Sequence, residues 1–174
     1  MALRASKLRN LEVFLGLALL TQLQWLFGNI YEEVLIPNSI AASIPALNAY
    51  NAFFQYTKPY HYYIPFTQLG FVVILILALS GSVPSTVKAP LSRAAIFGAT
   101  GIFLTAFIVI RYNLRMFFGP VDSLGALVHR RYLEWAICNA IRISLVGCEV
   151  FFCIRAYRSL LLLNSSHSQD LSES

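Results

Sequence analysis

The sequence predicts an all-α integral membrane protein, built as an up-down bundle of four transmembrane helices. Hydrophobic residues make up 57% of the chain and charged residues only 12%, whereas soluble domains have about 45–50% and about 25%. The apolar residues also gather in four runs, separated by segments that contain proline, glycine or charged residues. We therefore expect one membrane domain over residues 1–163, with the lipid bilayer as its main partner.

Each run is close to the length that crosses a bilayer as a helix, about 20 apolar residues. We expect the spans at about 11–36, 62–80, 91–113 and 131–157. The first span should end at Pro37, because proline cannot continue a helix. Gly81 and two prolines make a short turn that places the second and third spans side by side and antiparallel.

Two further segments lie outside these spans. Residues 45–57 contain several aromatic side chains and predict a short helix that lies in the membrane interface. The end of the chain, residues 164–174, is rich in serine and predicts a disordered tail.

The basic residues lie at the ends of the apolar runs, where lipid headgroups and membrane topology account for them. The net charge of +5 therefore does not indicate a nucleic-acid partner. An even number of spans places both termini on one side, and that side carries seven lysine and arginine residues against five on the other. This bias predicts a multi-pass protein whose termini face the cytoplasm.

The last span carries polar residues at a depth where they are costly. Trp135, Asn139, Arg142, Val146 and Glu149 are spaced by four, three, four and three residues, so they share one face of a helix. A charged side chain in the middle of a bilayer costs about 2.5–3.5 kcal/mol even on lenient scales. This face is therefore expected to point at protein or at a polar cavity, where the Arg142 charge finds a partner.

An up-down topology brings the exit of span one, the entry of span two, the exit of span three and the entry of span four to one membrane face. Nearly all of the unusual polar residues lie at these four places: Asn29, Glu32 and Glu33, then His61, then Arg111 and Asn113, and finally Trp135, Asn139 and Arg142. We expect the two carboxylates to pair with the arginines, because an unpaired charge at that depth is unfavourable. The cluster is expected either to form a polar substrate pocket or to hold the helices together.

The closing half of the chain resembles a known family. Asn113 follows the third span, and the fourth opens with the pattern W-x-x-x-N-x-x-R at Trp135, Asn139 and Arg142. Both features are similar to those of small four-span membrane proteins of unknown function, a family that includes the fungal anthrone oxygenases. The resemblance covers about residues 11–157. It departs from the family after Asn113, where Leu114 and Arg115 stand in place of the usual V-P-x-N segment.

The resemblance implies a cofactor-independent oxygenase that uses molecular oxygen on an apolar aromatic or lipid-like substrate. His61 or Glu33 would remove a proton, and Arg142 or Arg111 would hold the resulting oxyanion. Trp135 would offer a flat apolar contact to a polycyclic ligand. Further substrate-binding residues are then expected at these positions: Asn29, Glu32, Asn113 and Asn139.

Two alternatives remain open at this point. The protein could be a non-enzymatic accessory or carrier protein whose polar cluster only locks the helices together. His61 and His129 lie at one membrane face, which leaves haem with two axial ligands as a further alternative. No H-x-x-x-H or E-x-x-H pattern occurs, so we expect no other metal site.

Overall fold

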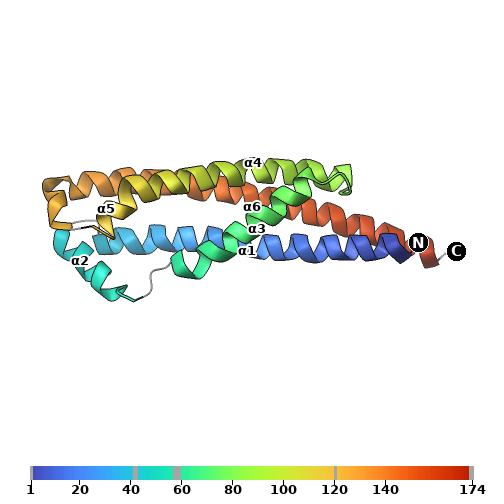
Figure 1. Ribbon diagram of the computed structural model, residues 1–174, viewed down its shortest axis with the longest axis horizontal. Helices are drawn as coiled ribbons and strands as arrows, with labels where there is room; N and C mark the ends of the chain where they lie inside the picture. Colours follow the sequence, from blue (N-terminus) through green and yellow to red (C-terminus); the bar gives the residue numbers. More distant parts are fainter. Residues whose placement is uncertain (1, 41–42, 57–59, 120, 173–174) are drawn as a thin grey trace.

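The computed structural model describes residues 2–40, 43–56, 60–119 and 121–172, and this part of the chain is helical with no β-strand (Figure 1). The main helices are α1 (Ala2–Ile40), α2 (Ile44–Phe53), α3 (Tyr60–Leu79), α4 (Ser85–Ile108) and α6 (Val128–Ser172). Three shorter turns join α4 to α6: the π-helix η1 (Val109–Asn113), α5 (Leu114–Met116) and the 3-10 helix η2 (Val121–Leu127). The all-α prediction is confirmed.

Three helical stretches are long and apolar enough to cross a membrane: Leu8–Val34, Ser85–Met116 and Leu124–Ser166. They correspond to the first, third and fourth predicted spans. The second predicted span coincides with α3, whose apolar stretch Ile64–Leu79 is shorter. In Figure 1, α3 runs obliquely between α1 and α4, while the other long helices lie nearly parallel to the long axis.

Each long helix packs against two neighbours. α6 contacts α1 and α4, and α3 contacts the same two helices from the other side. One apolar core forms near the start of α6, where Leu47 and Tyr50 of α2 pack with Ile108, Met116 and Trp135. A second core lies towards the termini and joins all four long helices. Figure 1 shows the N and C ends at the same end of the molecule.

The helix boundaries differ from the predicted ones at several places, of which three matter here. α1 continues past Pro37 to Ile40, because a proline in the last turn removes only one hydrogen bond from a helix that is about to end. α4 begins at Ser85 and contains Pro90 in its second turn. α6 extends to Ser172, where a disordered tail was predicted over 164–174; residues 173–174 lie outside the described part.

The connection between α1 and α3 contains the short helix α2, at nearly the predicted place. The Ser43 hydroxyl caps it by accepting a hydrogen bond from the backbone N–H of Ala46 at 3.4 Å. Residue 57, the last of the predicted segment 45–57, lies outside the described residues. In the other long connection, Gly125 takes a positive φ of 47°, which lets the chain turn sharply into α6.

Candidate functional site

The predicted partner of Arg142 is present on the first helix. The Arg142 guanidinium donates to the Glu32 carboxylate at 2.9 Å, and the side chains are only 3% and 11% exposed. Burial at this level shields the pair from water, so each charge depends on the other for its stabilisation. This ion pair joins α1 to α6 across about 110 residues of sequence.

Asn139, one turn before Arg142, connects the ion pair to the rest of α1. Its side-chain N–H group donates to the Glu33 carboxylate at 2.5 Å and to the backbone carbonyl of Asn29 at 3.4 Å. Its carbonyl oxygen accepts a hydrogen bond from Arg142. Both α1 carboxylates are thus held by side chains of α6, Glu32 by Arg142 as predicted and Glu33 by Asn139.

Trp135 connects η1, the turn that follows α4, to the same cluster. Its indole N–H donates to the Asn113 side-chain oxygen at 2.9 Å, and the ring is 1% exposed. Asn113 is the last residue of the π-helix η1. A π turn contains more residues per revolution than an α turn, so the residues that follow it are rotated relative to the preceding helix. This rotation presents the Asn113 amide to α6 and leaves Arg111 exposed.

A cavity of about 230 Å³ opens beside the ion pair. Glu32, Arg142 and Asn113 supply its polar surface. The rest of the wall comes from α3, α4 and the connection that follows: Ile64, Thr105, Val109, Leu114 and Phe118. A mainly apolar wall with a few polar groups at one end is the usual composition of a small-molecule site.

One polar atom of a residue that lines the cavity is buried and lacks a partner among the described residues. Within the described part of the chain, the Nε atom of Arg142 is buried and makes no hydrogen bond, although the terminal nitrogen Nη2 of the same guanidinium makes two. Both side-chain atoms of the neighbouring Asn29 are buried without a partner as well. Buried polar groups that lack partners are costly, so the described residues do not fully satisfy this cluster.

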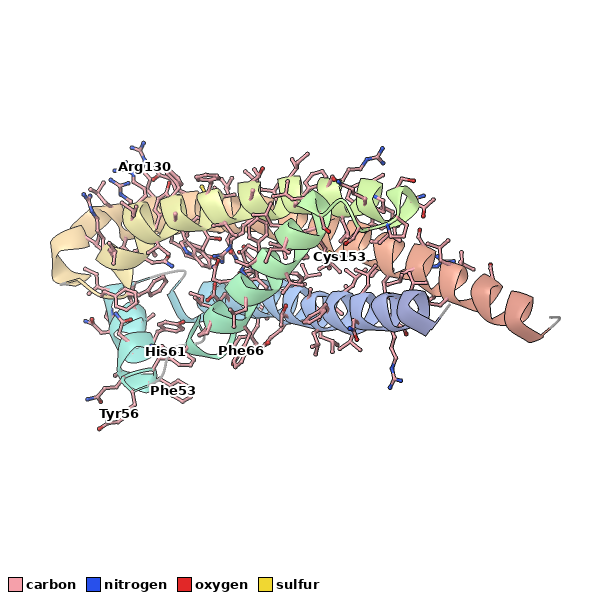
Figure 2. All side chains as sticks on the ribbon, turned by 45° about the vertical axis from the view of Figure 1, so that its right-hand side comes forward. Phe53, Tyr56, His61, Phe66, Arg130 and Cys153 are labelled. Carbon is pink, nitrogen blue, oxygen red and sulfur yellow. The ribbon has the colours of Figure 1, made fainter. Side chains whose placement is uncertain are left out.

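Two predicted site residues lie apart from the cavity. His61 and Arg111 are exposed, and neither lines the cavity. Figure 2 labels His61 at the start of α3, on the side where Phe53 ends α2 and Tyr56 follows it. The predicted pairing of Arg111 with an α1 carboxylate is not observed among the ion pairs of the described residues, where Glu32 binds Arg142. The other predicted site residues are brought together or line the cavity: Asn29, Glu32, Glu33, Asn113, Trp135, Asn139 and Arg142.

Sequence reasoning missed the apolar wall of the cavity. Thr105, Val109 and Leu114 belong to an ordinary apolar run, and no spacing or charge distinguishes them from residues that face lipid. It also missed Tyr50 of α2, which is 8% exposed. Burial raises the pKa of the Tyr50 phenol above its usual range, and the nearby Glu32 and Tyr31 add to the rise. Tyr50 therefore lies at the side of the cluster as a neutral hydroxyl group.

No known protein family, curated protein or solved structure matches this chain. Within the described residues, no group of three or more histidine, cysteine, aspartate or glutamate side chains is placed to hold a metal ion. The arrangement offers a fixed cation, an ion-paired carboxylate and an amide at the end of an apolar cavity. Such a set can bind an oxygen acceptor on an otherwise apolar molecule.

Proposed function

We propose that the chain is an integral membrane protein in which α1, α3, α4 and α6 form an up-down four-helix bundle. The three long apolar helices support this proposal. So do large apolar side chains on the outer surface, such as Phe103 at 78% and Ile110 at 68% exposure, because water would disfavour such a surface and lipid would not. The termini, which lie at one end in Figure 1, would face the cytoplasm, and the cavity would lie at the opposite membrane face.

We further propose that the cavity binds a small apolar molecule, aromatic or lipid-like, that carries an oxygen acceptor. The observation that carries this proposal is the mainly apolar cavity of about 230 Å³ whose polar surface comes from Glu32, Asn113 and Arg142. A carbonyl or phenolate oxygen in the cavity would accept from the Arg142 guanidinium, and Ile64, Val109 and Phe118 would contact the apolar body.

The chemistry that best fits this set is oxidation of an activated C–H group by molecular oxygen, as the family resemblance implies. Glu32, the carboxylate that lines the cavity, would take the proton, and Arg142 would stabilise the enolate oxygen. The carbanion would add oxygen to give a hydroperoxide. Loss of water then leaves a new carbonyl, so that one CH₂ group and O₂ become C=O and H₂O.

The test uses the purified protein in detergent with an anthrone under air, and follows quinone formation by absorbance. We expect a rate above the spontaneous one that falls at least tenfold in Val109→Phe, because the larger side chain fills the cavity. Ile110→Phe is the matched control, since residue 110 is 68% exposed on the outer surface. A rate equal to background, or an equal loss in both variants, would count against the oxygenase proposal.

A second candidate is a non-enzymatic accessory or carrier protein in which the cluster joins helices. The hydrogen bonds within the cluster favour it, because Glu32 and Arg142 already neutralise each other and Asn139 binds both Glu33 and Arg142. It predicts that Val109→Phe leaves every measured property unchanged. A spectral or calorimetric signal from a bound aromatic molecule that Val109→Phe abolishes would contradict the purely structural reading.

A further inference from the structure

A second polar pair lies deeper between the helices, away from the cavity. Glu149 of α6 and Gln22 of α1 are both 0% exposed. Glu149 lies seven residues beyond Arg142 on the same helix face, which corresponds to about 10 Å along the axis. Neither residue lines the cavity, and neither has a role in the proposed function.

Two glycines make room for this pair. A β carbon on Gly70 of α3 would lie 2.9 Å from the Gln22 side-chain nitrogen. A β carbon on Gly98 of α4 would lie 2.5 Å from Glu149 Oε1 and 2.8 Å from the Phe71 ring. Because Phe71 directly follows Gly70, both glycines face the same level of the structure. Gln22 and Glu149 therefore lie at about the same level between the four long helices.

Within the described residues, the pair contains acceptors that have no donor. Gln22 uses its N–H group to donate to the backbone carbonyl of Thr67 at 3.0 Å, and its own carbonyl oxygen has no partner. Both Glu149 oxygens also lack a partner. Three buried oxygens at this level therefore lack a donor among the described residues, and leaving them so is costly.

No charged group of the surrounding helices that the structure describes is placed to neutralise Glu149. At this level α1, α3 and α4 present Gln22, Thr67, Phe71 and Gly98, none of which ionises. On α6 itself, the flanking groups are Cys153, one turn further on, and Arg142, which is bound to Glu32. Arg93 of α4 lies exposed over the Phe152 ring, 5.7 Å from its centre.

We infer that Glu149 and Gln22 form a buried proton-binding site, in which the carboxyl group of Glu149 carries a proton and donates it to the carbonyl oxygen of Gln22. A single proton converts one of the three acceptors into a donor and removes the unpaired negative charge. The neutral carboxyl–carboxamide pair then joins α1 to α6 in the middle of the bundle. The glycines at 70 and 98 leave the space that this pair occupies.

Infrared spectroscopy of the full-length protein in lipid tests this directly, because the C=O stretch of a protonated carboxyl is separate from that of a carboxylate. We expect a protonated-carboxyl band at neutral pH that is absent in Glu149→Gln. In Gln22→Leu the band should persist and move to higher frequency, because its hydrogen bond is lost. Glu12→Gln is the control: this carboxylate accepts from Asn164 at 2.8 Å near the termini, and its loss should leave the band unchanged.

Two results would overturn the inference. The first is the absence of any protonated-carboxyl band at neutral pH in the natural protein, a measurement that does not depend on the variants folding. The second is a band that appears only when sodium is replaced by choline, which would mean that a cation and not a proton occupies the pair. If Glu149→Gln does not fold, the frequency shift in Gln22→Leu still assigns the band.

Discussion

Replacement of Arg142 by methionine should destabilise the protein more than any other single change in the cluster. Methionine fills most of the volume but leaves Glu32, whose side chain is only 11% exposed, without the arginine charge that balances it. Removing one partner of a buried ion pair costs about 3–5 kcal/mol. For a chain of this size each kcal/mol corresponds to about 2–4 °C in Tm, so a fall on the order of 10 °C is expected.

The assay is reversible unfolding in mixed micelles with increasing denaturing detergent, followed by tryptophan fluorescence. Glu32→Gln added to Arg142→Met should restore much of the lost stability, because no buried charge remains. Arg130→Met is the control: its ion pair with Glu134 is 78% and 31% exposed and should contribute about 0.2–1 kcal/mol. If Arg142→Met costs no more than Arg130→Met, the cluster is open to water and the buried ion pair is not what holds α1 to α6.

The same unfolding assay checks three other expectations. Trp135→Phe removes the 2.9 Å hydrogen bond to Asn113 and should cost about 0.5–1.5 kcal/mol; no loss would mean that the indole finds no fixed partner. Gly70→Ala places a β carbon against a threonine hydroxyl of α1 and should cost about 1–3 kcal/mol. Gly147→Ala, inside the helix α6 and with nothing within 4 Å of the new β carbon, should instead stabilise by up to about 0.5–1 kcal/mol. Burial raises the pKa of Tyr50, so the unfolded chain ionises first. Tyr50 should then lower the stability by about 1.4 kcal/mol per pH unit above pH 10, and Tyr50→Phe should remove this contribution from the measured slope.

Sequence patterns predicted the parts of the structure that follow from burial and periodicity. The long helices, the short helix before α3, and the pairing of Arg142 with a carboxylate of the first helix all follow from the cost of polar groups in apolar surroundings. The helix ends were less predictable, because Pro37 in a last turn disturbs little. The side chains of Arg111 and His61 were predicted to point inwards and are exposed.

These misses have a common physical cause. Whether a polar residue near a helix end faces inwards depends on helix rotation, and the π-helix at Val109–Asn113 changes that rotation without a sequence signal. The cavity wall was hidden for a related reason, since Val109 looks the same in sequence whether it faces lipid or a ligand. The partner that we infer for Glu149 could not be named from the sequence either. Gln22 is one of several amides on α1, and only the contacts of Gly70 and Gly98 show that Gln22 and Glu149 lie at the same height in the bundle.

The length of α6 has a mechanical consequence. Its 45 residues form a rod of about 68 Å at about 1.5 Å per residue, longer than the about 40–45 Å of a bilayer with its headgroups. In a bilayer the far part of α6 would therefore project beyond the headgroups, and there Asn164 ties it to Glu12 of α1. A rigid rod acts as a lever: a small tilt at Arg142 becomes a larger displacement at its tip. Spin labels on the projecting ends of α1 and α6 would thus report events at the cavity from outside the membrane.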